Sequence, residues 1–465
     1  MARDARHADI RLDVDPAHPT SAAPLEERPF RIAVLGDFSA RGVAGGTRDA
    51  PPQVSPVRVD RDDLETVLAR FAPQLAVGGS DIVFTSLDDF HPDHVHEHLP
   101  ALAPLHALRE DAASPRRRAA SAPEAGDGPV LDRILDAMPG SMPDLGTIAE
   151  SRDLAGYLRR IVEPHLIDHP TADQAAAVAQ VDAAIAAVIR AFLHQPEVQA
   201  LESLWRGLDL LVRRVETSSD LTIHVVDITY DEATRDPEGL ADRLRKPGGW
   251  AAVLCCYTVS ADSEVLAALP RIAALGRRLG APVLLGASPD LAAAAVRGTP
   301  TAASTGEDPS GWRQVRRGPD AAFLGLCHPR VLLRLPYGPD TDTCERFAFD
   351  EMPEGPDHRH YLWGEAALLC GVLLAEAFTN DGWGMRPGQA LEVARLPLHL
   401  WRDAGGTTHA LPCTESALDE DAAVRLLDSG IMPVVAIRGQ DTARLLRFQS
   451  VADPPAALAG PWTRR

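Results

Sequence analysis

Residues 250–288 read WAAVLCCYTVSADSEVLAALPRIAALGRRLGAPVLLGAS, and this stretch decides the fold. The apolar run 250–259 predicts a buried strand, the amphipathic segment 261–280 predicts a helix, and the apolar run 281–288 predicts a second strand. Two strands joined through a helix form a parallel pair, because a parallel connection needs a long crossover. The stretch therefore predicts an α/β fold with a largely parallel sheet that is covered by helices.

The chain between residue 129 and this stretch is mainly helical. The predicted elements are, in chain order, helices over 129–137, about 152–162, Ala172 to Leu193 and 197–217, and a strand over 220–230. Pro196 ends the third helix, because proline cannot donate a backbone hydrogen bond. Residues from 312 onward mix helix and strand. Within them, HYLWGEAALLCGVLLAEAF is apolar on most of its helical circumference, which predicts a helix buried on several sides.

An earlier block of the chain has its own strands and helices. An apolar run from Phe30 to Leu35 predicts a strand that ends in a Gly36-Asp37 turn. The segment VRVDRDDLETVLARF predicts a short strand and then a helix whose apolar stripe is Leu64, Val67, Leu68 and Phe71. Either Asp60 or Asp62 is expected to cap that helix. SDIVFTSLDDF alternates like a strand, and a further helix is predicted from Pro92 to Glu110.

The segment 111–128, DAASPRRRAASAPEAGDG, separates the two blocks. Its small, charged and proline-bearing residues cannot bury a core, so it is predicted to be a linker. The expected fold class is α/β (mixed α+β), with a small α/β unit joined to a larger α/β domain that begins with helices. The expected divisions are a flexible tail over 1–28, the small unit over 29–110, the larger domain over 129–453 and a tail over 454–465.

Composition excludes several classes of function. The 465 residues carry a formal net charge of -20, which disfavours binding to nucleic acid and to anionic membranes. Six cysteines without a C-x-x-C pair give no support for a zinc knuckle or a redox motif. The N-terminus lacks an apolar signal region, and no apolar run is expected to reach the roughly 20 residues that span a bilayer. A cytoplasmic protein without membrane insertion is expected.

The stretch DHVHEHLP raises the possibility of a metalloprotease, because His94, Glu97 and His98 spell H-x-x-E-H. This helix begins near Pro92, however, so the histidines fall on its first, frayed turns, where a solvated polar face is the simpler interpretation. Neither the P-loop pattern nor G-x-G-x-x-G nor G-x-S-x-G occurs. No catalytic residue, cofactor or metal ligand is assigned, and a zinc-dependent hydrolase is kept as an alternative.

The first block resembles the small sheath subunit of bacterial type VI secretion, called TssB or VipA. The resemblance is carried by PFRIAVLGDFSAR, VRVDRDDLETVLARF and SLDDFHPDHVHEHLPALAPLHALRE, and it runs from about Pro29 to Glu110. It includes Asp37 and Phe90. The resemblance implies that the histidines of HVHEH decorate the start of a sheath-protein helix.

The second block resembles the large sheath subunit, called TssC or VipB, over most of 129–453. Its most specific segments are HQPEVQALESLWRGL, LCHPRVLLRLPYG and YLWGEAALL. Residues proposed for packing or interfaces, from both blocks, are Asp37, Phe90, Trp205, Arg206, Arg330, Arg334, Tyr337 and Trp363.

The resemblance implies a non-enzymatic structural subunit, in which small and large sheath subunits are fused. Such a subunit assembles with copies of itself around an Hcp-like inner tube and contracts to drive that tube. Further partners implied are a ClpV-like AAA+ unfoldase and baseplate components, in the bacterial cytoplasm. The large subunit normally continues beyond the Gln449-Ser450 position, so a C-terminal truncation is expected here. This leaves an alternative, a sheath-like cap, adaptor or baseplate-associated protein that does not polymerise.

Overall fold

The computed structural model describes residues 28–42, 54–77, 80–113, 172–298, 311–403 and 405–463. The chain forms two compact units: unit 1 comprises Met1–His98 and Ile189–Arg465, and unit 2 comprises Leu99–Val188. The helices predicted over 129–137 and 152–162, the tail over 1–27 and the linker beyond residue 113 lie outside the described residues.

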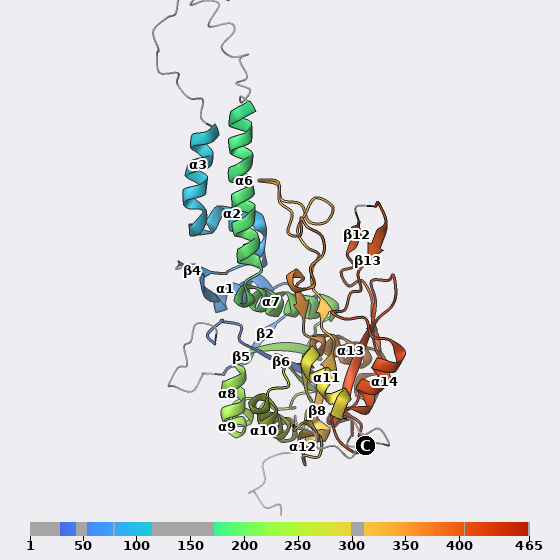
Figure 1. The fold of residues 1–465 in the computed structure, drawn as a ribbon. Helices are drawn as coiled ribbons and strands as arrows, with labels where there is room; N and C mark the ends of the chain where they lie inside the picture. Colours follow the sequence, from blue (N-terminus) through green and yellow to red (C-terminus); the bar gives the residue numbers. More distant parts are fainter. Residues whose placement is uncertain are drawn as a thin grey trace, which may run out of the picture. The chain divides into compact units, whose positions relative to one another are not determined.

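Unit 1 is built on a nine-stranded sheet with the strand order β11-β15-β14-β8-β7-β6-β1-β5-β2. Figure 1 labels β2, β5, β6 and β8 of this sheet. The strands are β1 (Phe30–Gly36), β2 (Val57–Val59), β5 (Leu221–Asp227), β6 (Ala252–Val259), β7 (Val283–Ala287), β8 (Leu324–His328), β11 (Glu392–Val393), β14 (Ile431–Ala436) and β15 (Ala443–Leu445). All pairings from β14 through β8, β7, β6 and β1 to β5 are parallel, whereas β2, β11 and β15 pair antiparallel. The predicted, largely parallel sheet is therefore confirmed.

The first block supplies a central strand of this sheet. β1 pairs with β5 from Phe30↔Leu221 to Gly36↔Asp227, and with β6 from Ile32↔Ala252 to Leu35↔Cys255. β2 then pairs with the other edge of β5. The two sequence blocks consequently share one sheet within unit 1.

Helices cover both faces of the sheet. The alternate residues Ala33 and Leu35 of β1 enter one core cluster. The helices that contribute to it are α8 (Tyr230–Arg235), α9 (Pro237–Arg243), α10 (Ser263–Leu279), α11 (Pro289–Gly298), α12 (Trp312–Arg316) and α14 (Glu420–Asp428). On the opposite face α13 (Ala366–Asp381) packs on β6, β7 and β8, and α7 (Pro196–Arg214) packs on α13. α13 is buried nearly all round, as its apolar circumference predicts.

Glycine permits the close approach of these layers. A Cβ atom at Gly371 of α13 would collide with Leu254 of β6, and one at Gly207 of α7 would collide with Leu368 of α13. The sheet, α13 and α7 therefore stack at a distance that larger side chains at these two positions would prevent.

The helix predicted from Pro92 to Glu110 is broken in three: α2 (Pro92–His98), a 3₁₀ turn (Pro100–Leu102) and α3 (Ala103–Ala113). The cause is Pro100, which drives Leu99 to an extended conformation with φ −74° and ψ 111°.

The N-terminal cap of α1 (Leu64–Phe71) is neither of the two predicted residues, Asp60 and Asp62. Asp63 occupies the cap position, while Asp60 accepts backbone N–H bonds from Asp62 and Asp63 just before the helix.

Among its described residues, unit 1 also has three two-stranded sheets. They are β3 (Gln74–Val77) with β4 (Ser80–Val83), β9 (Val331–Leu332) with β10 (Trp363–Gly364), and β12 (Leu400–Arg402) with β13 (Thr408–Ala410). The predicted C-terminal tail packs on the fold, because Leu458 is buried and Ala459 N–H donates to Ala322 O at 2.8 Å.

Unit 2 contains α3 and the first part of α6 (Ala172–Leu193). Arg109 Nε of α3 lies 2.6 Å from Asp182 Oδ1 of α6. By length and composition alone, Ala175–Leu193 is apolar enough to cross a membrane. The expectation that no apolar run reaches this length is therefore wrong, although a core helix of a soluble protein passes the same test.

Candidate functional site at the junction of the two sequence blocks

We define the junction as the contacts between residues 28–98 and residues 189–463, all within unit 1. At the start of β1, Phe30 is fully buried and its ring stacks on Phe378 of α13 with centroids 4.6 Å apart. Trp383 lies 5.5 Å from Phe30 and donates its Nε1–H to Arg28 O at 2.6 Å. Backbone pairing and aromatic packing therefore hold the same strand.

Trp205 of α7 is the centre of a second aromatic contact. Its side chain is fully buried, and its Nε1–H donates to Phe38 O at 3.2 Å. The indole lies edge-on to Phe38 at 5.1 Å and tilted against Phe71 at 5.8 Å. Because its one polar atom is satisfied, this tryptophan can lie in a dry interior without an unmet hydrogen bond.

Asp37 shapes the loop that follows β1. Its carboxylate accepts the backbone N–H groups of Arg41 at 2.9 Å and Gly42 at 2.8 Å. Burial raises the pKa of Asp37, and the two N–H bonds oppose that rise. Arg41, which the loop presents, reaches Asp227 at 3.2 Å and Glu232 at 3.3 Å. The turn of the first block is thereby clamped to the carboxyl end of β5.

A buried charge network lies beside α7. The side chains of Glu202 and Glu351 are both 0% exposed, and Arg334 joins them through contacts of 2.7 Å and 2.8 Å. Arg206 contacts Glu202 at 2.7 Å and donates to the Tyr337 hydroxyl at 2.9 Å. Two guanidinium groups thus balance two carboxylates, which is the condition under which buried charges are tolerated.

The network keeps Glu351 ionised. Burial alone would raise its pKa, but the Arg334 charge and hydrogen bonds from His194, Arg334 and the Tyr337 N–H lower that pKa to about 2. Arg334 also lies over the Tyr337 ring, with its guanidinium carbon 4.2 Å from the ring centroid.

Arg330 and Trp363 line a cavity of about 530 Å³ between α7 and the carboxyl end of β6. Arg330 forms a bidentate pair with Glu415 at 2.9 and 2.6 Å. Ser203, on the same wall, donates its hydroxyl to Trp363 O at 2.7 Å. Burial raises the pKa of the Cys256 thiol well above its usual value, so this cysteine is kept neutral. Neither side chain is an activated nucleophile.

The H-x-x-E-H residues do not converge on a common point. The His94 and His98 rings stack with centroids 6.1 Å apart, and His98 Nδ1 lies 3.0 Å from His94 O. Glu97 instead pairs with Arg346 at 2.9 Å.

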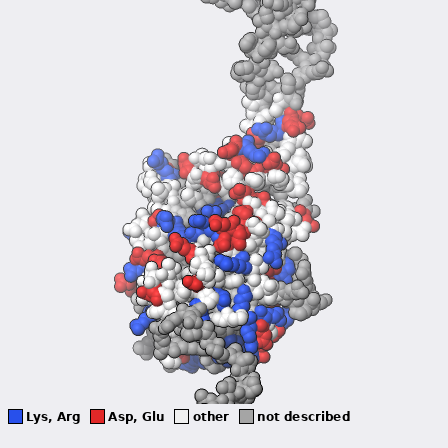
Figure 2. Space-filling model, turned by 180° about the vertical axis from the view of Figure 1, so that it is seen from behind, with Lys and Arg blue, Asp and Glu red and all other residues white. Residues whose placement is uncertain are grey.

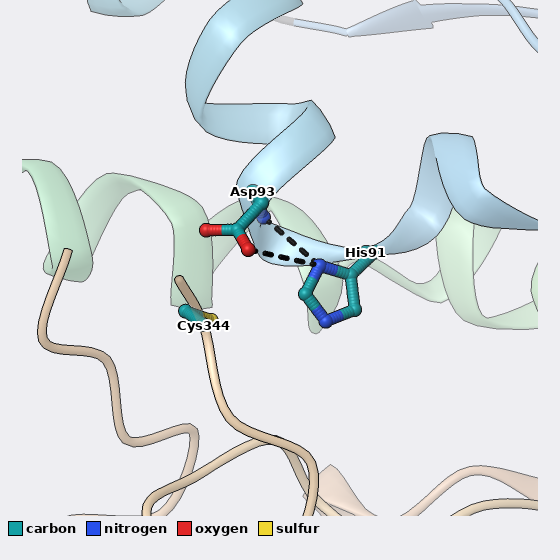
Figure 3. Close-up of side chains that lie close together, drawn as sticks. All are labelled: His91, Asp93 and Cys344. Carbon is teal, nitrogen blue, oxygen red and sulfur yellow. Dashed lines mark hydrogen bonds and ion pairs between the residues drawn. The ribbon is translucent and has the colours of Figure 1, made fainter. Parts of the chain in front are cut away.

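Within the described part of the chain, the group with metal-ligand spacing is His91, Asp93 and Cys344, whose ligand atoms all lie within 4.8 Å of one another (Figure 3).

The structure brings together some of the residues proposed from sequence. Trp205 and Arg206 lie on α7, and Arg334 and Tyr337 contact that helix, whereas Arg330 and Trp363 share the cavity. Phe90 lies elsewhere, fully buried and stacked on Phe84 at 4.4 Å. These are packing roles within one chain; a role between chains stays a prediction.

The residues proposed from sequence for packing or interfaces did not include Glu202, Glu351 or Arg41. The spacing of Glu202 and Arg206, four residues apart on one helix, is a readable signal for an ion pair. Glu351 and Arg41 carry no such signal, since their partners are distant in sequence.

On the face shown in Figure 2, blue and red residues are interspersed and form no single basic surface. This distribution fits the net charge of -20 and gives no footprint for nucleic acid on that face.

Two family profiles match the chain in the order of its two blocks. The VipA family of the type VI secretion system matches residues 3–127, and the VipB family, described as the tail sheath N-terminal domain, matches residues 175–452. The chain is 30% identical over 306 residues to the type VI secretion system sheath protein TssC1 of Pseudomonas aeruginosa. The alignment covers 60% of this chain and 61% of that relative, so the chain spans about three-fifths of the relative's length.

Proposed function

The chain belongs to the type VI secretion tail sheath family, and from this premise we propose that it is a sheath subunit whose small and large parts are fused in one polypeptide. The proposal covers a structural role, in which work is done by assembly and rigid-body movement. Such a role requires no active site.

The observation that carries the proposal is the position of β1. A strand from the small, VipA-like block lies between β5 and β6 of the large, VipB-like block. Fusion supplies the two blocks in equal amounts and at high effective concentration, which favours insertion of β1 over aggregation of an open sheet.

Assembly into a tube requires one heterologous interface that repeats from each copy to the next. In the nine-stranded sheet the outer strands are β2 and β11, so strand addition from a neighbouring copy would extend one of these edges. Main-chain hydrogen bonds formed in this way can persist while rigid units rotate during contraction.

The partners included in the proposal are copies of this chain, an Hcp-like inner tube, a ClpV-like AAA+ unfoldase and baseplate components, in the bacterial cytoplasm. Their support is the family membership, and no described residue is assigned to any of them.

Negative-stain electron microscopy of the purified chain, combined with sedimentation over a range of concentrations, tests the proposal. We expect tubes or cogwheel-shaped rings, alone or after addition of the inner-tube protein. Discrete small particles under all these conditions would contradict the sheath role and favour a cap or an adaptor that does not polymerise.

A further inference from the structure

We propose that His91, Asp93 and Cys344 form a binding site for one divalent transition metal ion, with zinc(II) as the best fit. The three side chains come from the two sequence blocks and converge between the start of α2 and the loop that carries Cys344 (Figure 3). This inference is independent of whether the chain assembles into a sheath.

The spacing of the ligand atoms suits a tetrahedral ion. Zinc bonds of about 2.0–2.3 Å place tetrahedral ligand atoms roughly 3.3–3.8 Å apart. His91 Nδ1 and Asp93 Oδ2 are separated by 3.7 Å, and all three ligand atoms lie within 4.8 Å of one another. A side-chain adjustment on the order of 1 Å at Cys344 would complete the geometry.

The carboxylate of Asp93 is held in place by the loop it faces. Its Oδ2 accepts the Glu345 N–H at 2.9 Å, and its Oδ1 accepts the Arg346 N–H at 3.1 Å. Each carboxylate oxygen has two lone pairs, so one on each remains for a metal ion. Hydrogen bonds of this kind orient a metal ligand, and here they also bring Cys344, the preceding residue, beside the carboxylate.

His91 presents the nitrogen that the site needs. Its Nδ1 accepts the backbone N–H of Asp93 at 3.2 Å, so Nδ1 is unprotonated and faces Asp93, and on metal binding its one lone pair would pass from this hydrogen bond to the ion (Figure 3). Its Nε2 lies 3.9 Å from Asp342 Oδ1. This separation is too long for a hydrogen bond, so Asp342 would have to move closer on metal binding to fix the His91 tautomer, as a carboxylate behind a metal-binding histidine does.

The donor set selects the kind of metal. One imidazole nitrogen, one thiolate and one carboxylate suit zinc(II) and its analogue cobalt(II), whereas magnesium and calcium prefer all-oxygen sites. On binding, the Cys344 thiol loses its proton to solvent and the sulfur bonds to the ion. The three protein ligands leave a fourth position for water.

The test uses the full-length chain, purified with a tag that contains no histidine and titrated with cobalt(II). We expect about one cobalt(II) per chain to survive dialysis, with a thiolate-to-cobalt charge-transfer band in the near ultraviolet. Cys344→Ser should abolish that band, and Asp342→Asn should weaken binding by about 10- to 100-fold. The same protein exposed to zinc(II) should retain one equivalent by elemental analysis.

Two variants serve as matched controls. Cys256→Ser removes another half-buried cysteine, and His94→Ala with His98→Ala removes the H-x-x-E-H histidines; both should keep the band and the stoichiometry. Far-ultraviolet circular dichroism checks the fold of each variant. If the Cys344→Ser protein does not fold, the His91→Gln protein is tested in its place. A band that survives Cys344→Ser or is lost in Cys256→Ser, or metal retained equally by all variants, overturns the proposal.

Discussion

β1 and α2 belong to the same sequence block but join the rest of unit 1 in different ways. β1 shares its backbone hydrogen bonds with β5 on one side and β6 on the other. α2 is held by side-chain contacts, such as the pair of Glu97 with Arg346, in which both groups are about half exposed. The first block is therefore built into the sheet at one end, and at the other end it is attached by side chains to the loop that carries Glu345 and Arg346.

This difference teaches where the stability of the fused chain lies. Backbone pairs in a buried parallel sheet cannot be replaced by water without large cost, whereas exposed ion pairs contribute about 0–1 kcal/mol. Substitutions near β1 should consequently be far more damaging than substitutions on the exposed face of α2, which carries His94, Glu97 and His98.

The largest effect is expected for Ala33→Asp. Ala33 is fully buried in β1, and a carboxylate there would lose its hydration, at a cost on the order of 5 kcal/mol or more. We expect loss of soluble folded protein, measured by yield and circular dichroism. Arg58→Gln on the exposed face of the edge strand β2 is the control and should fold normally. A stable, folded Ala33→Asp protein would contradict the claim that β1 is more important for stability than the exposed face of α2.

The second-largest loss of stability is expected for Trp205→Ala. It empties a fully buried site and removes the hydrogen bond to Phe38 O, so a loss of about 3–5 kcal/mol in the free energy of unfolding is expected. Urea denaturation measures this loss. Trp401→Ala, at a half-buried position in the outer hairpin, should cost clearly less. Equal losses at the two tryptophans would show that α7 is not central to the junction.

Arg334→Ala should cost about 3–5 kcal/mol, because it leaves Glu202 and Glu351 buried without their shared partner. Arg213→Ala removes an ion pair with Asp209 in which the arginine is 63% exposed, and should cost only about 0.3–0.5 kcal/mol. Denaturation of both variants at neutral pH compares them directly. Similar values for the two would contradict the assignment of the buried network.

Acid should weaken the same network through Glu351. Its pKa is lowered from 4.5 to about 2, so its contribution is complete above pH 4.5 and is lost as the pH falls toward 2. This shift corresponds to at most about 3 kcal/mol. Unfolding free energies measured across that window should fall less steeply in Glu351→Gln than in the unsubstituted chain. An identical slope in both proteins would refute this account of Glu351.

The smallest effect is expected on α2. His94→Ala with His98→Ala alters an exposed helix face and should change the unfolding free energy by no more than about 0.5 kcal/mol. Thermal denaturation tests this expectation. A loss as large as that of Trp205→Ala would mean that α2 is more than a surface contact.

Much of the architecture could be predicted because hydrophobic periodicity reports burial. The run from Phe30 to Leu35 gives β1, and 250–288 gives β6, α10 and β7. Periodicity does not identify neighbours, however, so the placement of β1 between β5 and β6 could not be derived from it. The break at Pro100 was readable in principle, since proline restricts the residue before it.

The site was harder to predict than the fold. The i,i+4 spacing of Glu202 and Arg206 is visible in the sequence, but the link from Arg334 to Glu351 depends on the course of a loop. The same reason hid the proximity of Cys344 to His91 and Asp93. The segment HVHEH matches a metalloprotease motif in its residue types, but the geometry of its side chains does not.

Hydrogen–deuterium exchange of the full chain tests most directly whether the two blocks share one sheet. We predict that the amides of Phe30–Gly36 exchange as slowly as those of Leu221–Asp227 and Ala252–Val259, since all three segments should open only on global unfolding. Rapid exchange of Phe30–Gly36 while the other two segments stay protected would contradict the central position of β1.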